Sequence, residues 1–231
     1  SNTAGGSATT STYIDDFPLG VRARDIRLID VERVEVLKGP QGTLYGQSAM
    51  GGTIRYITSK PTTENLSGKV DSYISNTEDS DGLNVGVNGH VNVPISDNLA
   101  VRLVGYQYDN DGFVDVKGGF PKEDANEEDT TGGRLSVLWN ITDSATLDFV
   151  YLKQSIEAGE PRVSETFELV PTGPVDLQPI DLSDPADQTK VTWTNKDEYF
   201  NLKLDLAFDI ANLSLMGSKK ELTELRTEDQ G

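Results

Sequence analysis

The sequence predicts a mainly β fold, in which a short Gly-rich part precedes an antiparallel sheet of about seven long strands. Three observations support this prediction. Apolar and polar residues alternate along the chain after residue 61, which places one set on each face of a sheet. Tight turns alternate with long acidic links between these stretches, and five glycines fall within the 14 residues that end at Gly52.

The balance of acidic and basic residues changes near Pro61. Residues 1–61 carry 7 basic and 6 acidic residues, whereas residues 62–231 carry 13 basic and 32 acidic ones, which together give the net charge of −18. We therefore predict two domains, 1–61 and 62–231. A nucleic-acid partner is excluded, because so acidic a chain repels phosphate groups. The chain has no Cys, which excludes disulfides and thiolate metal sites.

A Gly-rich motif ends the first domain. Glycine allows positive φ and close approach of other backbone, so this density of glycine predicts a packed turn. A phosphate-binding loop is excluded, because Gln47 and Ser48 follow Gly46, where a P-loop requires Lys. The residues that define the motif are Gly39, Pro40, Gly42, Gly46, Gly51 and Gly52, and a β-prone run follows at residues 53–58.

This motif resembles the end of the plug domain of TonB-dependent outer-membrane receptors. The segments Asp30–Lys38 and Tyr13–Leu19 are similar to earlier parts of that domain, so the resemblance covers roughly residues 11–61. The residues that carry it are Gly39-Pro40-Gln41-Gly42-Thr43-Leu44-Tyr45-Gly46, then Ala49, Gly51-Gly52 and Ile54.

The second domain reads as paired strands of about 12 residues, which is long enough to cross a bilayer at a tilt. Tight turns near Asp97, Asp143 and Asp209 alternate with long links at about 111–130 and 157–195, a pattern of outer-membrane barrels with short periplasmic turns. Val104 and Val150 interrupt the alternation, because they fall on the polar face. The predicted strands are about 66–77, 82–95, 98–110, 131–142, 145–156, 196–208 and 211–224.

Aromatic residues lie near both ends of these strands. Trp139 and Phe208 are next to the predicted periplasmic turns. Lipid-facing strands carry an aromatic belt at each interface, so we expect two such belts here. The belt nearer the loops would consist of Tyr106, Tyr108, Tyr151 and Tyr199.

No constellation for catalysis is found. The single His, His90, falls on the polar face of a strand, where it serves as a hydrogen-bonding group or titrates against a ligand. Prolines in 157–195 (Pro161, Pro171, Pro174, Pro179 and Pro185) suggest an ordered, ligand-facing loop. Acidic residues in the first long link would suit either a hard cation such as Ca²⁺ or a solvated loop; they are Glu123, Asp124, Glu127, Glu128 and Asp129, with Asp109-Asn110-Asp111-Gly112 nearby. We expect no enzyme, no catalytic residue, no metal and no cofactor.

The resemblance implies the function. In that family a plug folds inside a transmembrane β-barrel, and the receptor takes up a scarce solute, most often an iron–siderophore complex. The implied partners are outer-membrane lipid, the ferric siderophore or another small solute, and the TonB complex, which binds a TonB box that this chain lacks. The implied location is the outer membrane of a Gram-negative bacterium.

Seven strands are too few for such a receptor, whose barrel has about 22 strands. Open sheet edges are intolerable in hydrocarbon. We therefore expect a fragment of a longer protein or a truncated reading frame, which gives no energised uptake when it is reconstituted alone in liposomes. The expected structure is an open, curved sheet around part of a plug, with the motif Gly39–Gly52 against the polar face near Asn88 and His90.

A soluble or surface β-sandwich that acts as a binding or adhesion module is the alternative. The two folds differ in what covers the apolar face. In a sandwich Leu202, Leu204 and Leu206 would pack against a second sheet, whereas in a barrel they would face lipid.

Overall fold

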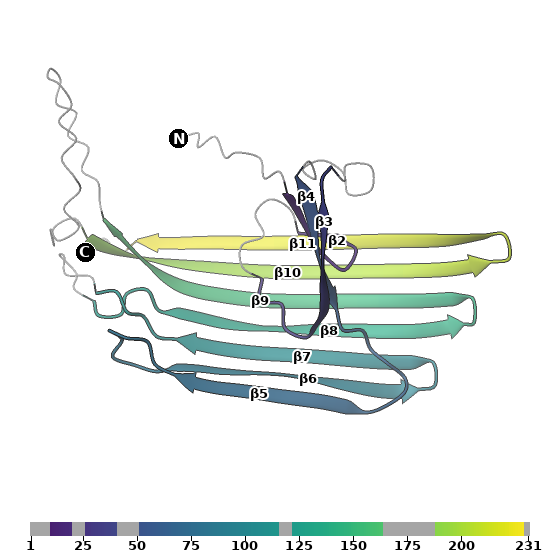
Figure 1. Cartoon of the computed structure of the whole chain (residues 1–231), viewed down its shortest axis with the longest axis horizontal. Helices are drawn as coiled ribbons and strands as arrows, with labels where there is room; N and C mark the ends of the chain where they lie inside the picture. The colour runs from purple at the N-terminus through teal and green to yellow at the C-terminus, as the bar shows by residue number, and fades with distance from the viewer. Residues whose placement is uncertain (1–9, 20–25, 41–50, 116–121, 164–187, 229–231) are drawn as a thin grey trace, which may run out of the picture.

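Two β-sheets form the structure, a computed structural model that describes residues 10–19, 26–40, 51–115, 122–163 and 188–228 (Figure 1). We call them the small sheet and the large sheet. The small sheet contains β1 (Thr10–Ile14), β2 (Phe17–Pro18), β3 (Val31–Lys38) and β4 (Gly52–Thr58), in the order β2-β1-β4-β3. Strand β1 runs parallel to β4, whereas β2 and β3 are antiparallel to their neighbours.

The large sheet is an antiparallel meander of seven strands in sequence order. The predicted fold class is therefore confirmed for this part of the chain. Figure 1 shows the strands of the small sheet running across those of the large sheet. The strands are β5 (Ser67–Ser75), β6 (Asn84–Ser96), β7 (Leu99–Asn110), β8 (Glu128–Thr142), β9 (Ala145–Val163), β10 (Gln188–Phe208) and β11 (Ala211–Glu228).

Strands β9 and β10 are longer than the sequence predicts. The alternating pattern ends near residue 156 in β9 and begins near residue 196 in β10, yet their pairing continues without a register shift to Gln188 and Val163. Backbone hydrogen bonds hold a hairpin together whether or not its side chains alternate, so the pattern marks only the part of each strand that has two different faces. The predicted long link is correspondingly shorter.

The two faces of the large sheet differ in polarity. The inner face, which we define as the face toward the small sheet, buries polar side chains such as Asn92 (0% exposed), Arg134 (4%) and Gln154 (1%). The outer face carries large apolar side chains that are 38–57% exposed; they include Val85, Val87, Leu103, Trp139, Phe200, Leu202, Phe208, Leu213 and Leu215.

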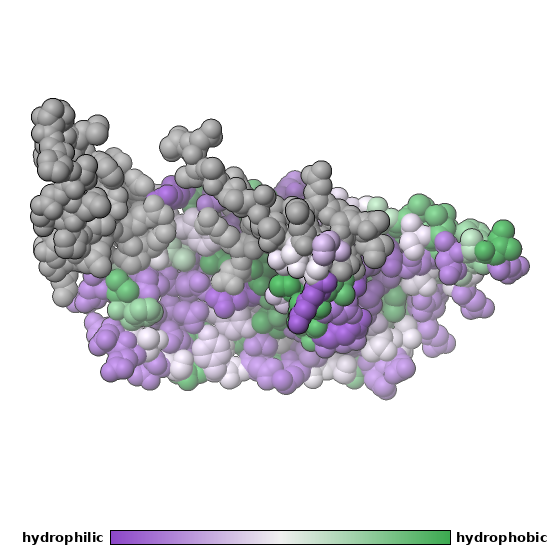
Figure 2. Space-filling model, turned by 45° about the horizontal axis from the view of Figure 1, so that its top comes forward, coloured by the Kyte–Doolittle hydropathy of each residue, from purple (hydrophilic) through white to green (hydrophobic). Residues whose placement is uncertain are grey.

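This polarity contradicts the β-sandwich alternative. The small sheet meets the polar face, whereas Leu202 on the apolar face stays 38% exposed. Figure 2 shows hydrophobic residues gathered at the end of the large sheet where β10 turns into β11. No helix among the described residues is long and apolar enough to cross a membrane.

The predicted aromatic belt near the loops is wrong for three of its four members. Tyr106 and Tyr199 are buried on the inner face, and Tyr108 lies on that face two residues after Tyr106. Only Tyr151 lies on the outer face, where it pairs with Leu135 and Phe200. Proximity to a strand end does not decide the face of a residue; its position in the two-residue period does.

An apolar contact joins the two sheets. Ile14 and Phe17 of the small sheet, together with Leu19 just after β2, form one buried cluster with Leu152 and Tyr199 of the large sheet. The rings of Phe17 and Tyr199 meet edge to face, with centroids 5.6 Å apart.

The residues that interrupt the alternation belong to this inner face. Val150 borders the buried cluster, and Val104 is 7% exposed. The registers of β7 and β9 against their neighbours are regular at both positions. The interruptions therefore mark where the small sheet covers the inner face and where apolar burial is favourable.

Candidate functional site

The contact between the two sheets centres on Asp30, which directly precedes β3. Its backbone has φ of 61°, a left-handed conformation that Asp tolerates better than most residues. Its carbonyl accepts a hydrogen bond of 3.0 Å from Ser59 N, just after β4. The residue is thus fixed from both sides of the β3–β4 pair, and its carboxylate reaches the large sheet.

Two arginines on neighbouring strands bind this carboxylate. Arg102 of β7 donates from Nε to Oδ2 at 2.7 Å and from Nη2 to Oδ1 at 2.6 Å. Arg134 of β8 donates from Nη2 to Oδ2 at 2.9 Å and from Nη1 to the carbonyl of Ile29 at 3.0 Å. His90 completes the group, since its Nδ1 lies 3.6 Å from Asp30 Oδ1.

The charged side chains of this group are buried, so their interaction matters for stability. The side chains of Asp30, Arg134 and Arg102 are 4%, 2% and 10% exposed. Burial alone would raise the pKa of Asp30, but the hydrogen bond from Arg102 and the charges of both arginines outweigh it and hold that pKa below its usual value. Removing one partner of such a buried group typically costs about 3–5 kcal/mol. We call Asp30, Arg102 and Arg134 the Asp30 anchor.

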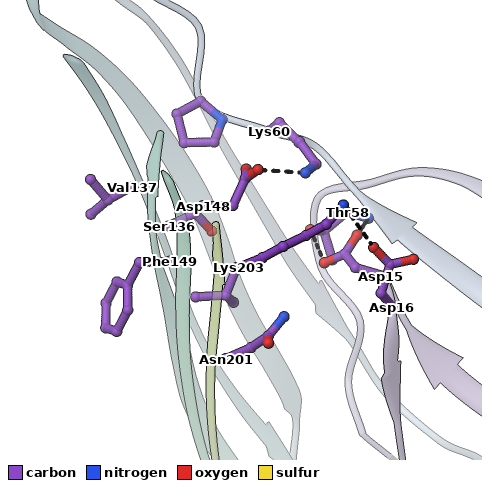
Figure 3. A pocket seen from close by; sticks show the side chains of 12 residues that line it. Asp15, Asp16, Thr58, Lys60, Ser136, Val137, Asp148, Phe149, Asn201 and Lys203 are labelled. Atoms are coloured by element: carbon purple, nitrogen blue, oxygen red, sulfur yellow. Dashed lines mark hydrogen bonds and ion pairs between the residues drawn. The ribbon is translucent and has the colours of Figure 1, made fainter. Parts of the chain in front are cut away.

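A second contact lies in a small pocket between Asp15–Asp16 of the small sheet and strands β8–β10 (Figure 3). The partly buried carboxylate of Asp15 accepts hydrogen bonds from Thr58 N and Thr58 Oγ1, both at 2.9 Å. Burial raises the pKa of Asp15, although these hydrogen bonds oppose the shift. Val137 and Phe149 border the pocket but point to the outer side of the large sheet (Figure 3).

Two ion pairs cross this pocket. Lys60 Nζ lies 3.1 Å from Asp148 Oδ1, and Lys203 Nζ lies 3.4 Å from Asp16 Oδ2. The side chains of Lys60 and Asp16 are 51% and 44% exposed, and exposed pairs of this kind contribute roughly 0–1 kcal/mol. The pocket therefore holds the sheets together much more weakly than the Asp30 anchor does.

The predicted glycine motif is only partly described. Gly39 (φ 86°) and Gly52 (φ 151°) have conformations that favour glycine, and Gly39 N donates to Gly51 O at 3.3 Å. A Cβ on Gly52 would lie 2.6 Å from Leu37 O, so this glycine permits the close pairing of β3 and β4. These contacts stay within the small sheet. Pro40 is among the described residues and lies outside the strands. Gly42 and Gly46 lie outside the described residues.

Contact of the motif with Asn88 and His90 stays a prediction. Among the described residues it is Asp30 that lies beside His90. Sequence reasoning missed the Asp30 anchor. The available signal was a pair of arginines, Arg102 and Arg134, on the inner face of adjacent predicted strands, where two buried positive charges require a carboxylate from elsewhere.

Three acidic residues of the first long link each contact a different partner. Glu127 pairs with Lys122, Glu128 pairs with Arg27, and Asp124 accepts a hydrogen bond from Asp81 N. Within the described ranges, no three acidic or His side chains are grouped so as to hold a metal ion. Of the prolines in the second link, Pro161 lies in β9 and the others lie outside the described residues.

Comparison with known proteins agrees with this architecture. The family model described as TonB-dependent Receptor Plug Domain matches residues 3–53. The probable TonB-dependent siderophore receptor PirA of Acinetobacter baumannii is 34% identical over 146 residues, which are 60% of this chain and 19% of that protein. The ferric enterobactin receptor PirA of Pseudomonas aeruginosa is 30% identical over 131 residues, which are 52% of this chain and 17% of that protein.

The fold is similar to that of a solved siderophore receptor. The crystal structure of the siderophore receptor PirA from Pseudomonas aeruginosa matches with a TM-score of 0.66 at 17% identity, over 96% of this chain and 34% of that chain. The chain therefore spans about a fifth of the length of the curated relatives above and about a third of this solved chain.

Proposed function

Because this chain belongs to the TonB-dependent receptors, we propose that it forms the plug and an adjoining part of the barrel wall of an outer-membrane importer for ferric siderophores. The small sheet is the plug part and the large sheet is the wall, with residues 1–61 and 62–231 as the two domains. The glycine motif is a structural motif of the plug. Lipid, the TonB complex and a ferric siderophore are the partners.

The Asp30 anchor is the observation that best supports this proposal. A plug must close the barrel against leakage at rest and must move when transport is energised. A buried carboxylate with two arginine partners holds the small sheet on the inner face, and the weak ion pairs of the pocket leave the other side easier to release. The machinery moves a solute and makes or breaks no covalent bond in it, so it requires no catalytic residue.

Uptake of radioactive iron by cells tests the proposal. The gene that encodes this chain is deleted from its host, and uptake of ⁵⁵Fe supplied as the host's own siderophore complexes is measured under iron limitation. We expect uptake to fall on deletion, to return with the intact gene and to stop when an uncoupler collapses the proton gradient. Unchanged uptake after deletion, with every complex supplied, would refute the proposal.

A further inference from the structure

Strand β10 carries a polar side chain at every second position along its inner face. The outer face of the same strand carries Phe200, Leu202 and Leu204, so the polarity follows the two-residue period of the strand. β10 lies between β9 and β11, and both of its edges are paired. We call these inner-face residues the β10 strip; they are Asn195, Asp197, Tyr199, Asn201, Lys203 and Asp205.

Several polar atoms of the β10 strip are buried without a hydrogen-bond partner among the described residues. They are Asn195 Oδ1, the Tyr199 hydroxyl and Asn201 Oδ1, and Ser136 Oγ of the nearby strand β8 is in the same state. A buried atom of this kind has lost its hydrogen bonds to water and has gained none in the fold, which costs free energy. The closed arrangement of the two sheets therefore leaves this part of the inner face poorly satisfied.

Two small cavities lie between the β10 strip and the edge of the small sheet. The pocket of Figure 3 and a second cavity each enclose about 20 Å³. They share Asp15, Val150 and Asn201, so they adjoin along β9 and β10, and the second cavity continues to Phe17 and Tyr199. Most of a protein interior is packed without voids that hold a water molecule. The contact of the two sheets is thus loosely packed along this line.

The inner faces of β6 and β7 make a more complete contact. Asn92 of β6 accepts a hydrogen bond from Thr62 N at 2.9 Å and donates to the carbonyls of Thr62 and Asn65 at 2.9 and 2.8 Å. Arg102 of β7 makes two hydrogen bonds to the carboxylate of Asp30. The small sheet is therefore held firmly on the β7 side, and the β10 side is the one that opens at lower cost.

We propose that the β10 strip, with Ser136 beside it, forms the wall of the passage through which a ferric chelate crosses the receptor, an inference that rests on the proposed function. When the small sheet moves away from β10, the ion pairs of the pocket break and the buried oxygens become accessible. They then accept hydrogen bonds from the N–H and O–H groups of the chelate and of its hydration shell. Hydrogen-bonding groups that line a pathway determine which solutes it passes.

Cysteine labelling of the full-length receptor in intact cells tests the passage. The present chain contains no Cys, and the receptor without a substitution gives the background. The probes are Ser136→Cys, which replaces one oxygen by sulfur, and Asn201→Cys. Ala100→Cys is the matched control, because Ala100 is fully buried on the inner face of β7. Val150→Cys, between the two cavities, replaces a probe variant that does not reach the outer membrane.

The reagent is a membrane-impermeant fluorescent maleimide, added to iron-limited cells during uptake of the host's ⁵⁵Fe siderophore complexes. A parallel sample receives an uncoupler. We expect the uncoupler to reduce labelling of Ser136→Cys and Asn201→Cys at least about fivefold, because these thiols are accessible only while the passage opens. Labelling of Ala100→Cys should change less than about twofold. Equal labelling of both probe variants with and without the uncoupler, or labelling of Ala100→Cys as strong as theirs, would overturn the inference.

Labelling should also obstruct the passage. After the free reagent is removed, a second round of ⁵⁵Fe uptake is measured in the same cells. We expect cells with Ser136→Cys to lose most of their uptake if they were labelled during transport and to keep it if they were labelled in the presence of the uncoupler. Cells with Ala100→Cys should keep their uptake after both treatments. Full uptake through receptors labelled at Ser136→Cys would show that the solute passes elsewhere.

The inference and the proposed function fail in different ways. If uptake of every iron complex survives deletion of the gene, the proposed function fails. If uptake depends on the gene but Ser136→Cys and Asn201→Cys are not labelled during energised uptake, only the passage along β10 fails.

Discussion

Asp30 joins parts of the chain that lie 72 and 104 residues away from it, at Arg102 and Arg134. Nothing local in the sequence marks it, because it stands in a connection between strands. The alternating pattern places both arginines on the inner face, and the burial of two positive charges requires a negative partner. The identity of that partner depends on how the small sheet lies on the large sheet. No local sequence pattern specifies this arrangement.

Replacement of Asp30 should loosen the plug. In Asp30→Asn the fold keeps its left-handed residue, since Asn also tolerates that conformation, but Arg102 and Arg134 lose their counter-charge. We expect a cost of about 3–5 kcal/mol in the stability of the docked plug. Hydrogen exchange of the amides of residues 26–34 in the full-length receptor measures it as faster exchange.

Glu32→Gln is the matched control for Asp30→Asn. Glu32 pairs with Arg33, and both side chains are more than half exposed. We expect a change within about 0.5 kcal/mol. Equal protection of residues 26–34 in the wild type and Asp30→Asn would show that the anchor does not hold the plug.

Acidification should release the plug through Asp30. The folded-state pKa of Asp30 is lowered from 3.8, so its stabilisation is present above that value and is lost as the pH falls through the folded pKa. Asp15 acts in the opposite sense, because its folded-state pKa is raised and its protonation favours the folded state. Scanning calorimetry of the receptor should show a plug transition that weakens below about pH 4.

The variant Asp30→Asn separates these two effects. It should show a weaker plug transition at neutral pH and no further loss below about pH 4. In Asp15→Asn the loss on acidification should persist. A wild-type transition that is equally stable at pH 2.5 and pH 7 would contradict the assignment to Asp30.

At the scale of single elements, the strands follow from the sequence more closely than their contacts do. Alternation locates all seven strands of the large sheet and the three tight turns, because each strand has one polar and one apolar face. The alternation shows that Tyr106 and Tyr199 lie on the inner face only when positions are counted in steps of two from a residue whose face is already known. It does not reach the far ends of β9 and β10, where the two-faced pattern ends.

The pairing of β3 with β4 should depend on Gly52. In Gly52→Ala the new Cβ would lie 2.6 Å from the backbone carbonyl oxygen of Leu37, in a conformation that L-residues avoid. We expect a cost of about 1–3 kcal/mol, measured as faster hydrogen exchange of the β3 and β4 amides. Gly217→Ala, whose Cβ meets nothing within 4 Å, should leave these amides unchanged. If the β3 and β4 amides exchange at the same rate in both variants, the motif does not have this structural role.

At the scale of the whole molecule, the sequence indicates which face of the large sheet is apolar but not what lies against the other face. The resemblance of residues 11–61 to a plug domain supplied that part, and the structure places the small sheet there. The buried cluster around Phe17 and Leu19 depends on shape as much as on polarity, so it could not be derived from a period alone.

The orientation of the sheet in the membrane can be measured with epitope tags in the full-length receptor. A tag inserted after Asp79, in the link between β5 and β6, should bind antibody on intact cells. A tag inserted after Asp143, in the tight turn between β8 and β9, should bind only after the outer membrane is permeabilised. The reverse pattern would invert the proposed topology.

The length of the β9–β10 hairpin has a consequence for the cell surface. Its strands contain 19 and 21 residues, whereas about 10 residues at a tilt cross the apolar band of an outer membrane. In the proposed receptor roughly half of each strand therefore stands clear of the lipid, as a stiff rib tens of ångströms long. In the proposed receptor such a rib carries the far end of the β9–β10 hairpin well above the apolar band, so the outer rim of the wall is made of paired strands there.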